Sequence, residues 1–286
     1  MVFADITRKQ AFLTHLAVST VIFFVLLYLI IYKWYPSYYF HIDGGYRGIA
    51  TIFFVDMVLG PGLTLLVFKP GKPGLKFDMT VILLLQAIAL TWGIKSVYFE
   101  RPMLTVFYDG KFSCMSYSET SDFDLERLAL DDAKPPLLAV LPRPSTHKEY
   151  QEMMLEAFRH SSAEIYVFSE KLLPLDAVGT VQIMNFKLDV PGSFYGGRED
   201  KEKYQRIWQQ YLENNPGAQQ RYLFYPMSCR YNNVLAVFDP ESSSIVDFVP
   251  VYTDRAESSV KLGFTLEELE EIEEIKRQQE QEQSDN

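Results

Sequence analysis

A carboxylate stands within one of the most apolar stretches of the sequence. Asp56 lies in FFVDMVLGPGLTLLVF and is followed closely by Gly60, Pro61 and Gly62. Carboxylates at membrane depth are costly and usually face a helix bundle or a polar path. Proline removes a helical hydrogen bond and kinks the helix, while small residues let a neighbouring helix approach. Either Asp56 is neutral, or bonded to Thr51 or another helix, and fixes packing, or it serves a polar function inside the membrane.

Two cysteines, Cys114 and Cys229, are more than a hundred residues apart, and each lies in or beside a predicted strand. In an oxidising compartment two such cysteines most often pair. Their disulfide would be worth about 4 to 5 kcal/mol by the loop-entropy model, less any strain. The alternative is a pair of buried free thiols. A redox function is weakly supported because neither cysteine has a resolving neighbour.

The other residues that could do chemistry form no recognised constellation. The sequence has no phosphate-binding glycine loop and no HExxH, GxSxG or CxxC motif. The histidines are interpreted as structural or surface residues, since His147 and His160 are too far apart on one predicted helix to form a local metal pair. Gly192, Gly196 and Gly197 fit the turn before a helix better than a ligand loop. We expect no catalytic residue, no cofactor, no metal, and a protein that is not an enzyme.

Long apolar segments must position Asp56 and its neighbours. A bilayer core of about 30 Å requires about 20 apolar residues in helical form. Three segments meet this requirement, at about 11–32, 48–68 and 79–99. A cleaved secretory signal is the alternative for the first segment, but its apolar run is too long and no small-x-small site follows. Residues 1–100 are therefore predicted to form a three-helix transmembrane region.

The distribution of cations predicts the orientation of these helices. Arg8 and Lys9 precede the first segment, and the short loop KPGKPGLK places three lysines between the second and third. Other cations lie near the opposite ends of the helices, but the density of cations is higher in this short loop. By the positive-inside rule the N-terminus is cytoplasmic, and three crossings place the rest of the chain outside the cytoplasm.

The remainder of the chain reads as a soluble α+β domain, residues 101–263, followed by a charged helix and disordered tail at 264–286. Helical periodicity marks 147–160 and 199–215. Short apolar runs predict strands at 103–108, 111–117, 137–141, 164–168, 180–188, 221–226, 233–238 and 244–249. Strands and helices do not alternate strictly, which is typical of an α+β fold.

Charge excludes one class of partner. The chain carries a formal net charge of -10, although its first 110 residues hold nine Lys and Arg against six acidic residues. The soluble part is therefore strongly acidic. Nucleic acid binding requires clustered cations, so we expect no nucleic acid partner. The same charge disfavours a domain that lies flat on anionic lipid.

The segment VDMVLGPGLTLLVFKPGKPGLKFD, within 41–112, and the ERP after the third apolar segment resemble the bacterial type IV pilin accessory proteins. These are inner-membrane pilin assembly chaperones. The resemblance is strong over about the first 115 residues, and RYNNVLAVFDPESSSIVDF is the most similar part of the soluble domain. It implies a multi-pass inner-membrane protein with a periplasmic domain, involved in type IV pilus biogenesis and fimbrium assembly by binding rather than catalysis.

The resemblance also implies a partner. A pilin awaiting assembly is held in the inner membrane by its N-terminal helix, so the expected partners are the major type IV pilin, the pilus assembly platform and the membrane. The helix bundle would lie beside the pilin helix and the acidic domain against its head. Asp56 with Gly60, Pro61 and Gly62 form the candidate contact with the pilin helix. The alternatives are a membrane-anchored periplasmic ligand sensor and a thiol oxidoreductase.

Overall fold

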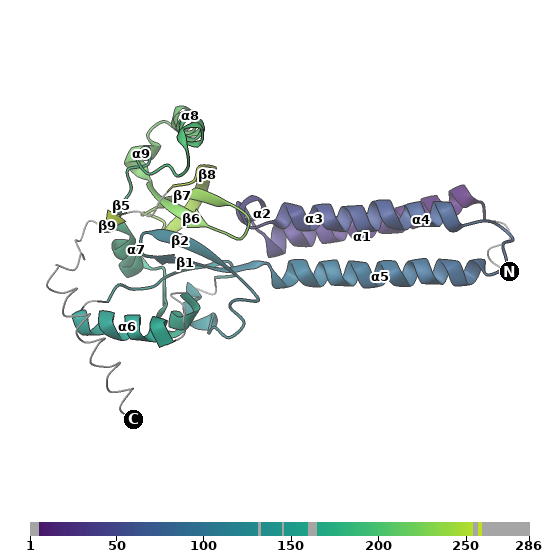
Figure 1. Cartoon of the computed structure of the whole chain (residues 1–286), viewed down its shortest axis with the longest axis horizontal. Coiled ribbons are helices and arrows are strands. Elements are labelled where there is room, and N and C mark those ends of the chain that lie inside the picture. The colour runs from purple at the N-terminus through teal and green to yellow at the C-terminus, as the bar shows by residue number, and fades with distance from the viewer. Residues whose placement is uncertain (1–5, 131–132, 145, 160–164, 254–256, 259–286) are drawn as a thin grey trace, which may run out of the picture.

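The chain forms a bundle of three long helices that extends from one side of a sheet domain (Figure 1). The computed structural model describes residues 6–130, 133–144, 146–159, 165–253 and 257–258. Among these residues, three helices are long and apolar enough to cross a membrane, Arg8–Trp34, Gly45–Val67 and Leu75–Phe99. The predicted fold class, a three-helix membrane bundle followed by a soluble α+β domain, is confirmed.

Each span is built from recognisable local elements. The first is α1 (Arg8–Leu29), which ends in the π-helical segment η1 (Ile30–Trp34). The third is the single helix α5 (Leu75–Phe99). The second combines α3 (Gly45–Phe53), the π-helical η2 (Phe54–Leu59) and α4 (Gly60–Val67). Pro61 lies in the first turn of α4, so the wider π-helical segment accommodates the backbone around its missing N–H.

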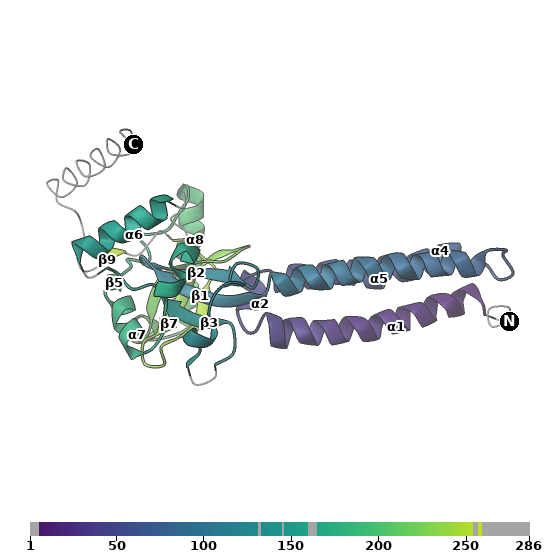
Figure 2. The ribbon, with the colours of Figure 1, turned by 90° about the horizontal axis from the view of Figure 1, so that it is seen from below.

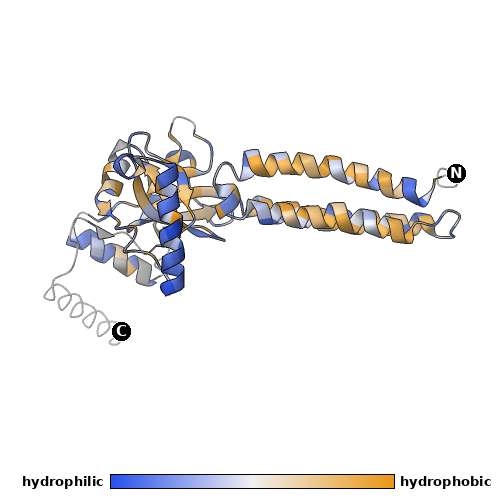
Figure 3. Ribbon diagram, turned by 90° about the horizontal axis from the view of Figure 1, so that it is seen from above, coloured by the Kyte–Doolittle hydropathy of each residue, from blue (hydrophilic) through white to orange (hydrophobic). Residues whose placement is uncertain are grey.

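The second span is the central element of the bundle. α1 packs along α4, and α5 packs along both α3 and α4. α1 and α5 are separated in the two side views (Figures 1 and 2). The helices are apolar around most of their surface (Figure 3). In the most apolar stretch of each span only 17%, 28% and 6% of residues, respectively, are buried within the protein, as expected of helices that face lipid.

A seven-stranded mixed sheet forms the centre of the soluble domain, with strand order β4-β3-β1-β2-β6-β7-β8. β1 pairs in parallel with β3, and β2 with β6, while the other neighbours are antiparallel. The strands are β1 (Pro102–Tyr108), β2 (Lys111–Ser116), β3 (Leu137–Val140), β4 (Leu173–Pro174), β6 (Leu223–Ser228), β7 (Asn233–Asp239) and β8 (Ser244–Val249). Asp109 and Gly110, with φ of 51° and 82°, form the tight turn between β1 and β2.

Helices surround this sheet. They are α6 (His147–Arg159), α7 (Ala177–Met184), α8 (Arg198–Asn214), α9 (Ala218–Arg221) and the 3₁₀ segments η3 (Glu126–Leu128) and η5 (Ile165–Lys171). A second, two-stranded sheet pairs β5 (Phe186–Lys187) with β9 (Glu257–Ser258). The two helices predicted at 147–160 and 199–215 correspond to α6 and α8. The charged helix predicted at 264–286 lies outside the described residues.

Two predicted strands are wrong. Residues 164–168 fall largely in η5, and most of 180–188 forms α7, with only Phe186 and Lys187 in a strand. The alternating apolar pattern of 180–188 favoured a strand, but Asp176 begins a helix instead. Its carboxylate accepts a hydrogen bond from the Gly179 backbone N–H at 2.8 Å, which satisfies a free donor of the first turn. The helix then buries Ile183 completely.

The loop between the first two spans reaches into the soluble domain. Its short helix α2 (Tyr39–Ile42) places Tyr39 and Ile42 in the same core cluster as Phe107 of β1. The Tyr39 hydroxyl lies 2.6 Å from Thr105 Oγ1. The continuous α5–β1 connection and this loop therefore both attach the sheet domain to the bundle.

Candidate functional site

Asp56 is the centre of a polar contact among all three spans. Its Oδ1 accepts hydrogen bonds from Ser19 Oγ of α1 at 3.2 Å and from Gln86 Nε2 of α5 at 2.6 Å. The side chain is only 1% exposed. Asp56 thus bonds to the other two spans, as expected if it fixes the packing of the helices. Thr51 is not a partner, because its hydroxyl donates to the carbonyl of Arg47.

The glycines around Pro61 differ in their roles. A Cβ at Gly60 would collide with the Gln86 amide, so glycine at this position is what lets Gln86 approach the second span. Pro61 is buried beside it. A Cβ at Gly62 would meet nothing within 4 Å, so Gly62 takes no part in this close approach.

A groove of about 440 Å³ opens between α1 and α5, with the second span behind it. Its wall is almost entirely apolar. It runs from Ile6, Phe68 and Met79 at the end far from the sheet domain to Ile22 and Leu90 further along the bundle. Among the four residues predicted to contact a partner, Asp56 lines this groove, whereas Gly60, Pro61 and Gly62 do not.

The polar atoms of the groove are incompletely paired. His15 and Thr64 satisfy each other, with 2.6 Å between Nδ1 and Oγ1. Asp56 Oδ2 and Gln86 Oε1, in contrast, are buried acceptors that have no hydrogen-bond partner among the described residues. The groove therefore combines an apolar wall with two unused acceptors at one depth.

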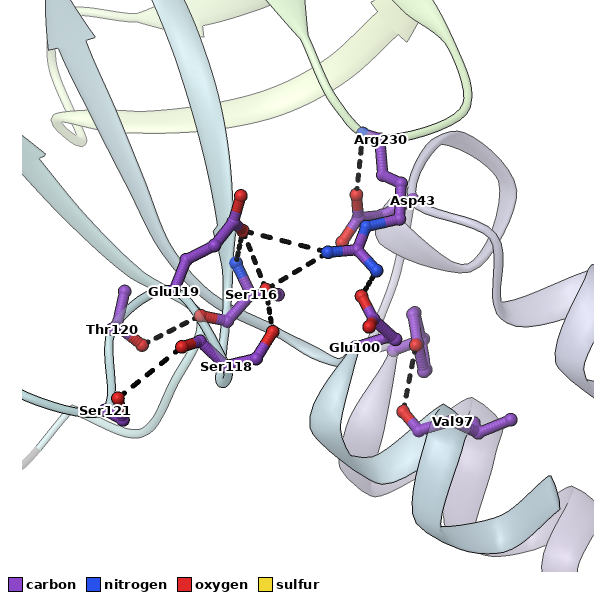
Figure 4. A network of polar contacts seen from close by, with 10 residues as sticks. Asp43, Val97, Glu100, Ser116, Ser118, Glu119, Thr120, Ser121 and Arg230 are labelled. Atoms are coloured by element: carbon purple, nitrogen blue, oxygen red, sulfur yellow. Dashed lines mark hydrogen bonds and ion pairs between the residues drawn. The ribbon is translucent and has the colours of Figure 1, made fainter. Parts of the chain in front are cut away.

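A second polar network lies where the bundle meets the sheet domain (Figure 4). Arg230, in the loop between β6 and β7, forms an ion pair with Glu100 at the end of α5 and donates to Ser116 Oγ of β2 at 3.3 Å. The backbone N–H of Arg230 donates to Asp43 Oδ1 at 3.1 Å. This loop thus contacts the connection between the first two spans, the end of α5 and the sheet.

Asp43 is buried in this junction, with 3% of its surface exposed. Burial raises the pKa of its carboxyl to about 6, against the hydrogen bond and charge of Arg230, which lower it. The charge of Glu119 raises it further. Neither Asp43 nor Arg230 was predicted from the sequence to be a site residue, although both lie in the stretches that carry the family resemblance.

Cys114 and Cys229 form a disulfide, with their Cα atoms 4.8 Å apart. The bond joins β2 to the residue before Arg230 and packs against the main core cluster of the domain. Asn232, on the other side of the same loop, donates to the carbonyl of His41 at 3.0 Å. The disulfide therefore anchors the loop that contacts the membrane helices.

Known proteins similar to this chain act in fimbrial assembly. Over 110 residues the chain is 33% identical to the fimbrial assembly proteins of serogroups I and E1 of Dichelobacter nodosus, and 32% identical to that of serogroups C1 and C2. The matches cover 35% of this chain, 42% of each of the first two proteins and 83% of the third. The chain thus spans less than half the length of the first two relatives.

No family model and no solved structure matches the chain. The family assignment therefore rests on these relatives, one of which is covered over most of its length. Their names refer to fimbrial assembly, which agrees with the resemblance seen in the sequence. The chain belongs to the family of these fimbrial assembly proteins.

Proposed function

We propose that this protein is an inner-membrane chaperone that binds the major type IV pilin and promotes its assembly into pili. The observation that carries the proposal is the apolar groove between α1 and α5, which lies along the membrane spans beneath a folded soluble domain. The names of the relatives add that the family acts in fimbrial assembly.

The groove suits a helix embedded in the bilayer. Helices in a membrane associate through close packing and hydrogen bonds, since lipid tails are as apolar as leucine. Leu83 and Ala87 of α5 face Val18 and Ile22 of α1 across an apolar surface that lipid chains would otherwise fill. A pilin helix lying there would pack against two spans at once, while its head remained beside the acidic soluble domain.

The proposed orientation places the N-terminus in the cytoplasm and the soluble domain in the periplasm. Two features support it. The Cys114–Cys229 disulfide suits an oxidising compartment. At the opposite end of the bundle, Arg8 Nε donates to the carbonyl of Phe68, and Lys69 and other lysines follow, in keeping with a cytoplasmic face.

In-membrane crosslinking followed by affinity capture of the full-length protein tests this proposal. The major pilin should be the dominant partner. A tagged inner-membrane protein of unrelated function serves as the control. Recovery of pilin at no more than the control level would contradict the proposal.

A matched pair of variants locates the contact. Ala87 lines the groove, whereas Ala89 is exposed on the other side of the same helix. Ala87→Trp fills the groove and should reduce pilin recovery about tenfold, because steric overlap costs about 1 to 3 kcal/mol. Ala89→Trp places the same ring in lipid and should leave recovery unchanged. Equal recovery from the two variants would show that pilin binds elsewhere.

A further inference from the structure

The polar cluster beside the groove has two acceptors that lack a donor among the described residues. Gln86 Nε2 is directed to Asp56 Oδ1, with the Asp56 carbonyl and Ser19 Oγ further away at 3.3 and 3.5 Å. Ser19 uses its own hydroxyl proton on the same Oδ1. Within the part of the chain that the structure describes, Asp56 Oδ2 and Gln86 Oε1 therefore remain without a donor.

No cationic side chain of the groove supplies one. Along the described part of the chain, the residues that line it include no Lys and no Arg, and the nearby His15 is engaged with Thr64. Hydrocarbon contains no water to substitute, and a buried acceptor without a partner costs free energy. In the unbound bundle these two acceptors thus lack hydrogen bonds that a bound helix can supply.

We infer that the groove selects a membrane helix that carries a hydrogen-bond donor, a side-chain hydroxyl, amide or ammonium group, at the depth of Asp56. The inference rests on the proposed function, because it assumes that the guest is a helix, and it adds the chemistry by which that helix is recognised. Apolar packing along the groove does not by itself discriminate between apolar helices. The donor supplies the discrimination, since it forms hydrogen bonds that an all-leucine helix cannot.

Gln86 contacts the carboxylate directly. It is half-buried and reaches Asp56 from α5 at the end of a flexible side chain. In the proposed complex, a rotation of this amide would let Asp56 Oδ2 and the Gln86 carbonyl oxygen accept hydrogen bonds from the bound helix.

The test uses synthetic helices as probes with the full-length protein in lipid bilayers. One probe is an all-leucine membrane helix, a second carries one asparagine at its centre, and a third carries that asparagine seven residues away, about 10 Å along the axis. Association is measured by energy transfer at low peptide-to-lipid ratio. The central asparagine should strengthen binding about threefold to tenfold over leucine, and the displaced asparagine should not.

Two variants complete the design. Asp56→Asn keeps the size of the side chain and the Ser19 contact but loses one acceptor oxygen, and it should abolish most of the preference. Thr91→Val removes a hydroxyl that is bonded to the Ala87 carbonyl and lies outside the groove lining, and it should change nothing. Binding of both probes with equal strength, or an unchanged preference in Asp56→Asn, would overturn the inference.

These outcomes are separable from the proposed function. If pilin is captured and Ala87→Trp blocks it, but the probes show no preference for a donor, then the groove binds a pilin helix without this recognition. If the donor preference holds and pilin is not captured, the recognition stands and the assigned partner is wrong.

Discussion

The sheet domain and the helix bundle differ in how far they bury their large apolar side chains. In the domain, the rings of Phe107, Phe112 and Tyr225 lie within 4.9 to 6.0 Å of one another and are almost completely buried. In the bundle, Leu84 and Trp92 of α5 are 59% and 77% exposed. The domain completes its own core, whereas the bundle leaves surface for lipid or for another helix. The groove is the part of that surface beside which two buried acceptors lack hydrogen-bond donors among the described residues.

The largest expected effect comes from removing the disulfide, which belongs to the sheet domain and not to the bundle. Cys114→Ala with Cys229→Ala removes a crosslink between residues 115 positions apart. By the loop-entropy model this should lower the free energy of unfolding of the sheet domain by about 4 to 5 kcal/mol. Urea unfolding followed by near-ultraviolet circular dichroism measures it. Reducing agent should reproduce the loss in the native protein and have no effect on the variant, and an equal response of both would contradict the assignment.

The next effect compares one side chain from each region. Phe112→Ala opens a cavity in the domain core and should cost about 3 to 5 kcal/mol in the free energy of unfolding. Leu84→Ala removes a side chain that faces lipid and should cost less than about 0.5 kcal/mol. The same unfolding measurement serves for both. Similar losses would mean that the two regions are packed alike.

The smallest effect concerns the junction and depends on pH. Burial raises the pKa of Asp43 to about 6 in the folded protein from its ordinary value of 3.8, so ionising this group opposes folding. Its contribution to stability is fully present below pH 4 and is lost as the pH rises through 6. At pH 7.5 Asp43→Asn should therefore be about 1 to 3 kcal/mol more stable than the native protein.

Other carboxyl groups also titrate in this range, so the informative quantity is the difference between Asp43→Asn and the native protein at each pH. That difference should shrink as the pH falls from 7.5 to 4.5. Arg230 and Glu119 are charged groups that act on Asp43. A difference that stays constant with pH would show that Asp43 does not titrate near 6.

The sequence predicts those parts of the fold that depend on local pattern. The three spans follow from the length of their apolar runs, and the β1–β2 hairpin follows from Asp109 and Gly110, both with positive φ. The strands expected at 164–168 and 180–188 failed because an alternating apolar pattern is ambiguous in short segments. The capping carboxylate of Asp176 was the signal that could have corrected the second.

The candidate site is less visible in the sequence. Asp56 stood out because a carboxylate in an apolar span is rare, but its partners Ser19 and Gln86 lie 37 and 30 positions away. The contact between Asp43 and Arg230 joins residues 187 positions apart. Such pairs are set by how helices and loops pack, and no local periodicity encodes them. The groove itself depends on the separation of α1 and α5.

Site-specific photocrosslinking along α5 tests the central claim most directly. Leu83 lines the groove and is 53% exposed, whereas Leu85 is 60% exposed and lies outside the groove lining. A photoreactive side chain at Leu83 should crosslink the major pilin through its membrane helix, and the same side chain at Leu85 should not. Pilin adducts of equal yield from both positions, or none from Leu83, would contradict the account.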